Sequence, residues 1–307
     1  MLMDYRTKLQ QIIVASGLSQ QSLAEKIGTS FVTLNNWLNG KSVPTRSNLI
    51  ASIDTLYLEF VGTDSVDLES LSVLKNQAQN RRLSVRALMK NKNLLDELTL
   101  SLTYNTNTIE GSTMTRSDVA AVLFNDEVLS NRTQVEQREA VNHRVALEYL
   151  LDELYANAEL KFSAEFIQKT HLLLMNGVLS NAGVWRNHGV RIQGSRVVLA
   201  NYTKIPDLIG KLCAELNSET DDPVALLAHT HATFEQIHPF SDGNGRTGRL
   251  LMFIKSLQLG IVPPVVAKER KMVYYRYLEL AQTRGRYDSL EQFIAETIIA
   301  TGDDVGI

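Results

Sequence analysis

The sequence has little of several features that mark special classes of protein. Its only cysteine, Cys213, excludes an internal disulfide, so nothing in the chain requires an oxidising compartment. No apolar run approaches the roughly 18 residues that a membrane span needs, and the N-terminus lacks the uninterrupted apolar stretch of a secretory signal. Repeats with a period of about 20–50 residues are also missing. We therefore expect a cytoplasmic protein with no membrane partner.

The sequence also lacks a large excess of charge of one sign. The 307 residues include 31 basic and 34 acidic side chains, a net charge of −3, which excludes a strongly charged protein that binds its partners through overall charge. The balance hides an asymmetry, because the first fifty residues carry five basic and two acidic side chains and the remainder carries a net −6. A small basic head on an acidic body favours a polyanion near the head alone. The hydrophobic content of 44% is enough for a sizeable core.

Proline is scarce as well, with six in the chain, and apolar residues recur at helical spacing along most of it. The repeating positions include Leu9, Ile12 and Ile13, then Leu94, Leu98 and Leu102, then Leu250, Leu251, Ile254 and Leu257. One segment differs: residues 190–199 hold two β-prone runs on either side of Gly194-Ser195, which predicts a small β-hairpin. The fold class is therefore expected to be mainly α with one hairpin.

A soft boundary lies at Val61-Gly62-Thr63-Asp64-Ser65, a plausible turn or linker after about four short helices. We predict a small all-α domain over residues 1–60, a connecting helical segment over 61–94, and the main domain over 95–307.

The basic head has the local signals of two short helices joined by a tight turn. Ser19 and Ser30 stand where helix N-caps are expected, and Gly28 between them suits a turn that needs positive φ. This order resembles the helix-turn-helix of phage-repressor-like regulators, whose second motif helix enters the major groove of DNA. The resemblance implies that DNA would be contacted by Phe31, Val32, Asn35 and Asn36, with Lys41 and Arg46 near phosphates. Because the second helix holds no Arg or Lys, a head that only packs or dimerises and a head that binds a peptide stay open.

The densest chemical signal is the run His238-Pro239-Phe240-Ser241-Asp242-Gly243-Asn244-Gly245-Arg246-Thr247-Gly248-Arg249. Glycines on both sides of Asn244, followed by a predicted helix start, let backbone N–H groups converge on a phosphate. Arg246 and Arg249 share a helix face and can hold successive phosphates. Asp242 is a hard carboxylate suited to Mg²⁺, and His238 can accept a proton near neutral pH. The run predicts a nucleotide phosphate cradle with a base beside it.

This run fits the His-x-Phe-x-Asp/Glu-Gly-Asn-Gly-Arg-x-x-Arg signature of the Fic family, which it resembles over roughly residues 95–300. The resemblance implies a Fic-type helical domain that transfers AMP from ATP to a Ser, Thr or Tyr hydroxyl of a target protein. His238 would accept the hydroxyl proton, and Asp242 would hold Mg²⁺. The implied nucleotide-binding residues are Gly243, Asn244, Gly245, Arg246, Thr247, Gly248 and Arg249. A homodimer and self-modification are also expected from the resemblance.

Two flanking segments extend the resemblance. Gly183-Val184-Trp185-Arg186 and the hairpin resemble the family's flap, which implies that Val190, Arg191, Ile192 and Gln193 position the target by strand addition. Tyr274, Tyr275 and Gln282 fall where the family lines its adenine pocket, although Gln282 departs from the more usual Asn.

A separate segment, Thr106-Asn107-Thr108-Ile109-Glu110-Gly111, is placed by apolar spacing at the C-terminal end of a helix. It resembles the Ser/Thr-x-x-x-Glu-Gly/Asn inhibitory motif of Fic proteins with an N-terminal inhibitory helix. The resemblance implies that Glu110 pairs with Arg249 and displaces the γ-phosphate of ATP. In some relatives the same glutamate supports removal of AMP, so this second activity stays open.

Other interpretations use the same residues. His231, Glu235, His238 and Asp242 would face one direction on a continuous helix, and with His229 they suggest a metal-dependent hydrolase. Ser241 beside Asp242 and His238 offers weak triad chemistry. A further alternative is a DNA-binding transcriptional regulator whose Fic body senses ATP.

Overall fold

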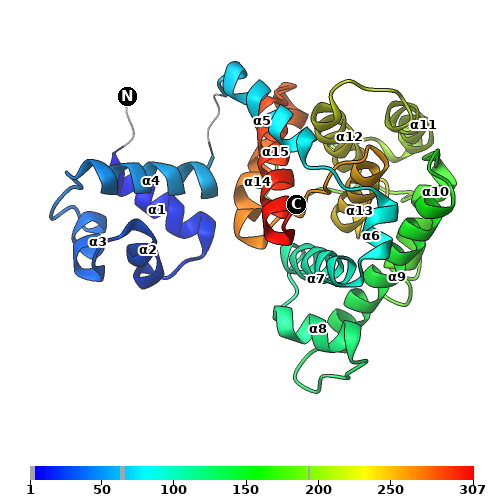
Figure 1. Cartoon of the computed structure of the whole chain (residues 1–307), viewed down its shortest axis with the longest axis horizontal. Helices are drawn as coiled ribbons and strands as arrows, with labels where there is room; N and C mark the ends of the chain where they lie inside the picture. The colour runs from blue at the N-terminus through cyan, green and yellow to red at the C-terminus, as the bar shows by residue number, and fades with distance from the viewer. Residues whose placement is uncertain (1–3, 63–65, 193) are drawn as a thin grey trace. The chain divides into compact units, whose positions relative to one another are not determined.

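The computed structural model describes residues 4–62, 66–192 and 194–307, and it divides into two compact units. The first unit joins residues 1–65 with residues 267–277, and the second joins residues 66–266 with residues 278–307. Both units are helical within the described residues, as Figure 1 shows. The expected mainly α fold is therefore confirmed. Within the same residues, no helix has both the length and the apolar composition that crossing a bilayer requires.

The first unit begins with four helices, α1 (Tyr5–Ser16), α2 (Gln20–Ile27), α3 (Phe31–Leu38) and α4 (Ser47–Phe60). The side chains of Ser19 and Ser30 accept the backbone N–H of Ser22 and Thr33, so both predicted N-caps are formed. Gly28 ends α2 at φ 82°, a left-handed conformation that costs glycine least. A compact apolar core that includes Leu23, Leu34 and Trp37 holds these helices together.

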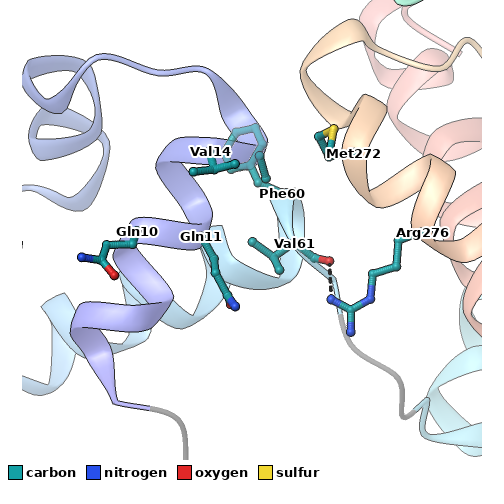
Figure 2. Close-up of a pocket in the computed structure, with 8 residues that line it drawn as sticks. Gln10, Gln11, Val14, Phe60, Val61, Met272 and Arg276 are labelled. Carbon is teal, nitrogen blue, oxygen red and sulfur yellow. Dashed lines mark hydrogen bonds between the residues drawn. The ribbon is translucent and has the colours of Figure 1, made fainter. Parts of the chain in front are cut away.

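The same unit includes the 3₁₀ turn η2 (Lys268–Arg270) and the first half of α14 (Lys271–Arg284). Figure 2 shows a pocket of about 330 Å³ there, where a side-chain nitrogen of Arg276 donates a hydrogen bond of 3.1 Å to the carbonyl of Val61. The pocket is lined by Gln10, Gln11, Val14, Ala15, Phe60, Val61, Met272 and Arg276. The C-terminal end of α4 and the start of α14 are thus tied together within this unit.

The second unit contains the remaining elements of the described chain. They are α5 (Leu68–Asn80), α6 (Val85–Lys90), α7 (Lys92–Ile109), α8 (Arg116–Phe124), α9 (Gln134–Ala156), α10 (Ala164–Leu174), η1 (Tyr202–Lys204), α11 (Ile205–Leu216), α12 (Pro223–Ile237), α13 (Asn244–Gln258), the second half of α14 and α15 (Asp288–Val305). Helix α13 is buried along almost its whole length, polar residues included. A short loop, residues 238–243, joins α12 to α13 and carries the dense motif.

The hairpin predicted over residues 190–199 is not formed. The described residues of this segment, 190–192 and 194–199, contain no strand, and Gln193 lies outside the described residues. A turn remains at the predicted place, because the N–H of Ser195 donates to the carbonyl of Ile192 at 3.2 Å. A two-stranded hairpin is marginal without a sheet or an apolar face to pack on, and side chains such as Val198 are exposed here. The β-prone residues therefore adopt an extended loop.

Candidate active site

The predicted base, His238, lies where α12 ends. Its backbone N–H donates to the carbonyl of Phe234 at 2.9 Å, and its φ of 48° places it in the left-handed region. That conformation costs a residue with a Cβ on the order of 1 kcal/mol. It turns the chain sharply away from α12, which is why the residues after His238 form a loop rather than a further helical turn.

Hydrogen bonding assigns the protons of the His238 ring. Nδ1 lies 3.2 Å from the carbonyl of Glu235, and only an N–H can make a hydrogen bond to that oxygen. Neutral His238 therefore carries its proton on Nδ1 and presents the lone pair of Nε2. Burial, followed by the nearby charge of Arg186, lowers the pKa of His238, although the hydrogen bond to Glu235 opposes the shift. A neutral imidazole with a free lone pair is suited to accept a proton.

Buried side chains hold the motif loop, residues 238–243, in place through ring stacking and hydrogen bonds. Phe240 is fully buried and stacks on the ring of His171 at 3.6 Å between centroids. Asn244 closes the loop with two hydrogen bonds of 2.9 Å, because its side chain accepts the N–H of Phe240 and donates to the Phe240 carbonyl. His171 accepts the N–H of Gly183 on Nδ1 and lies 2.9 Å from the Asp242 carbonyl through Nε2. These contacts fix the loop before any ligand arrives.

The start of α13 has the geometry of an anion site. Gly243, at φ 76°, is the N-cap of the helix and uses no side chain to cap it. The missing Cβ at Gly245 leaves room against the first turn of α13 for the carboxylate of Glu110, because a Cβ there would clash with a carboxylate oxygen of Glu110. Unpaired N–H groups and the positive end of the helix dipole favour an anion at this point. In the present structure the carboxylate of Glu110 lies beside it.

Glu110 also contacts the second motif arginine. Its Oε1 lies 2.5 Å from a terminal nitrogen of Arg249, whose Nε donates to the hydroxyl of Thr106 at 2.7 Å. The Arg249 side chain is 2% exposed and that of Glu110 is 30% exposed. Glu110 follows α7 as its C-cap residue, as the apolar spacing predicted. The predicted contact between Glu110 and Arg249 is therefore present.

The first motif arginine is paired as well. A terminal nitrogen of Arg246 lies 2.5 Å from Glu139 of α9, and the other lies 4.0 Å from Asp242. The side chain of Asp242 is 64% exposed, and it accepts the N–H of Gly243 at 2.6 Å. An exposed carboxylate beside a helix N-terminus that favours anions fits Mg²⁺, which is commonly held by one or two carboxylates together with substrate phosphates and water.

Two further motif residues face the protein interior. The hydroxyl of Thr247 donates to the carbonyl of Gly243 at 2.8 Å, and the Thr247 side chain is fully buried. A Cβ on Gly248 would lie 2.6 Å from a carboxylate oxygen of Glu235 and 3.0 Å from Phe234. Gly248 thus permits the close approach of α12 and α13.

The buried acids and bases near the loop do not assemble a metal site. Burial raises the pKa of Glu235 to about 7 and lowers the pKa of His231 to about 3. Since α12 ends at Ile237, Asp242 does not share a helix face with His231. His229 lies 3.1 Å from Glu291 instead. Across the described residues, no group of three or more His, Cys, Asp or Glu side chains could hold a metal ion.

The other predicted site residues are more dispersed. Arg191 is exposed, and Val190 and Ile192 are half-buried in the loop that replaces the hairpin. Gln282 donates to the carbonyl of Ala232 at 2.9 Å, which links α14 to α12. Tyr274 and Tyr275 belong to the part of α14 that groups with the first unit, so their place beside the nucleotide stays a prediction.

In the first unit, the side chains of Phe31 and Val32 are exposed at the start of α3, and those of Asn35 and Asn36 are half-buried. Lys41 and Arg46 are exposed after it. The predicted DNA-contact residues are therefore accessible, in whole or in part.

Two family profiles match the chain. Residues 161–254 match that of the Fic/DOC family, and residues 9–54 match that of a helix-turn-helix family. Residues 161–254 are therefore similar to a Fic/DOC domain. The matched region contains the whole loop with His238 and both motif arginines.

Curated proteins that are similar to this chain are named as transferases. A protein adenylyltransferase Fic of Drosophila ananassae is 29% identical over 268 residues, which cover 85% of this chain and 52% of the relative. A protein adenylyltransferase fic-1 of Caenorhabditis elegans is also 29% identical, over 58% of this chain and 35% of the relative. The chain thus spans about half or less of the length of these relatives.

Solved structures share the fold. A Fic domain containing signaling protein from Bacteroides thetaiotaomicron superimposes with a TM-score of 0.64 at 23% identity, over 76% of this chain and 94% of that chain. A fragment of Fic-1 from C. elegans gives a TM-score of 0.66 at 20% identity, over 99% of this chain and 88% of that chain.

Proposed function

We propose that this protein transfers AMP from ATP to a hydroxyl side chain of a target protein. The observation that carries the proposal is that His238, whose hydrogen bond to Glu235 leaves a lone pair on Nε2, begins the short loop that leads into the glycine-lined N-terminus of α13. The adenylyltransferase names of the relatives support the same reaction class.

The target oxygen attacks the α-phosphorus of ATP and forms the new O–P bond while its proton passes to Nε2 of His238. The bond from the α-phosphorus to the bridging oxygen breaks, and pyrophosphate leaves. Backbone N–H groups at Asn244 and Gly245, and that of Gly243 once it leaves the Asp242 carboxylate, would stabilise the charge that develops on the phosphates. Mg²⁺, held by Asp242, would supply further charge neutralisation.

The arginines complete the cradle in this proposal. Arg246 would bind the β-phosphate while Glu139 keeps its guanidinium oriented, and Arg249 would bind the γ-phosphate in place of Glu110. Thr247 and Gly248 would contribute only through the backbone, since the side chain of one and the missing Cβ of the other face the interior. Tyr274, Tyr275 and Gln282 would border the adenine.

The resting protein is proposed to be autoinhibited by Glu110. The carboxylate neutralises Arg249 and lies at the open face of Gly245, the two places that an ATP phosphate would need. Removal of AMP by the same glutamate and modification of the protein itself belong to the same proposal.

The test is labelling of a bacterial lysate with α-³²P-ATP and Mg²⁺ by the Glu110→Gly protein, followed by mass spectrometry of labelled bands. Label on a Ser, Thr or Tyr that disappears with His238→Ala supports the transfer. Label that persists in the double variant contradicts the transfer. So does the absence of any label from α-³²P-ATP with the Glu110→Gly protein at every Mg²⁺ concentration tested.

A second function is favoured by the exposed residues of α3. We propose that the helix-turn-helix unit binds DNA weakly, as a homodimer that doubles the few phosphate contacts. A gel shift over a salt series decides this: no sequence preference at low salt contradicts it. If ATP changed DNA binding while transfer stayed absent, the alternative of an ATP-sensing regulator would be preferred.

A further inference from the structure

Arg186 is a buried arginine that makes no ion pair with any described residue. Its side chain is 3% exposed, and burial lowers its pKa. The guanidinium donates four hydrogen bonds, all to backbone carbonyls: at 2.7 Å to His238, 2.7 Å to His188, 2.6 Å to Ala200 and 3.2 Å to Ile237. A buried charge without a counter-ion is costly unless its donors are satisfied. The positions of the four acceptors therefore indicate what this arginine does.

The acceptors fall into two pairs. His188 and Ala200 stand at the two ends of the extended loop that contains Val190, Arg191 and Ile192. Ile237 and His238 end α12 and begin the motif loop. The rigid, planar guanidinium of Arg186 therefore holds both ends of the loop against the backbone of the predicted base, His238. The single ammonium group of a Lys cannot reproduce this geometry.

Backbone contacts support the same junction. The N–H of Arg186 donates to the carbonyl of Pro239 at 2.9 Å, and the N–H of Ala200 donates to the carbonyl of Gln236 at 3.1 Å. The carbonyls at the end of a helix have no intrahelical partner, and His238 is held there at a positive φ. Arg186 satisfies the carbonyls of Ile237 and His238 and so stabilises the turn that presents the imidazole.

We propose that Arg186 is a positioning residue that fixes the target-binding loop, residues 188–200, relative to His238. The inference rests on the proposed AMP transfer. A target segment lying along Val190–Ile192 would then meet Nε2 of His238 in one register, and loss of the fork would let the loop move while the phosphate cradle on α13 stays in place.

The experiment compares Arg186→Lys and Arg186→Gln in the Glu110→Gly protein. Arg86→Lys is the matched control, since Arg86 is an exposed arginine of α6 and lies outside the target-binding loop. Hydrogen exchange should rise at least tenfold in residues 187–200 for both variants, with α13 and α15 still protected. Lysate labelling should fall at least thirtyfold while the KM for ATP stays within threefold, and Lys should retain more activity than Gln. The control should match its parent in all three measurements.

Unchanged exchange in residues 187–200 would overturn the proposal, as would a rise in the KM for ATP equal to the loss of rate. Loss of protection throughout α13 and α15 would show a general structural role and overturn it too. The exchange measurement needs no AMP transfer. An inactive Glu110→Gly parent would therefore refute the proposed function. Hydrogen exchange would still test whether Arg186 fixes the loop relative to His238.

Discussion

Replacing Glu110 should release the proposed brake, and the structure sets the size of the effect. The contact to Arg249 at 2.5 Å joins side chains that are mostly buried. A pair of charges about 4 Å apart at an effective dielectric of about 20 interacts by roughly 4 kcal/mol. Partial exposure of Glu110 and the Thr106 contacts that survive reduce this, so we expect about 2–3 kcal/mol, or roughly 30–150-fold in the rate of AMP transfer.

The assay is transfer of label from α-³²P-ATP at an ATP concentration below KM, with Glu110→Gly and Glu110→Gln. Glu97→Gln is the matched control, because Glu97 lies on the same helix and pairs with Arg116 at the surface. The control should stay within twofold of the parent. Equal rates for the parent and both Glu110 variants, with folding verified, would refute the reasoning that Glu110 and a phosphate compete for Arg249.

Three further predictions follow from the same contacts. Burial, followed by the charge of Arg186, lowers the pKa of His238. The pH at which kcat/KM of the Glu110→Gly protein falls to half should therefore lie below the ordinary histidine value of about 6.5, and a half-maximal rate above pH 6.5 contradicts this assignment. Glu235 has a pKa raised from 4.5 to about 7, so its contribution to stability is complete below pH 4.5 and is lost as the pH rises through 7. Glu235→Gln should therefore raise Tm at pH 8 more than at pH 5, and an equal change at both would argue against a buried neutral acid. Gly248→Ala should lower the free energy of unfolding, measured in urea, by about 1–3 kcal/mol through overpacking. Gly210→Ala should be neutral or stabilising, because a Cβ there meets nothing within 4 Å. Similar losses for both would contradict the close approach of α12 and α13 at Gly248.

The sequence predicted what depends on local rules. Ser19 and Ser30 cap their helices because a short side-chain oxygen three residues before a free N–H is a local arrangement. Glu110 falls at the end of α7 because apolar spacing locates a helix end to within a turn. The prediction of a hairpin over residues 190–199 was wrong. Whether β-prone residues form strands depends on a sheet or apolar surface to pack against, and the local sequence does not show whether that surface exists.

The residues that sequence analysis missed act across long separations. Glu139, His171 and Arg186 contact residues of the motif, 238–249, from 107, 71 and 52 residues away. No periodicity singles them out, and only the Gly-Val-Trp-Arg run drew attention to Arg186. Thr247 and Gly248 have packing roles that the dense motif did not predict. The Thr247 hydroxyl donates to the carbonyl of Gly243 at the helix start, and Gly248 lets α12 and α13 approach each other.

The two carboxylates that neutralise the motif arginines are not equivalent, and their helix positions explain which should yield to ATP. Glu110 stands at the C-terminal end of α7, where the helix dipole disfavours a negative charge, whereas Glu139 lies in the second turn of α9, nearer the favourable end. Glu110 is also the more exposed of the two. An incoming triphosphate should therefore displace Glu110 from Arg249 and leave Glu139 on Arg246. In the proposed function, an acidic body would thus bind a polyanion because its cationic groups are concentrated at one helix start, where Glu110 is the more readily displaced of their two internal counter-ions.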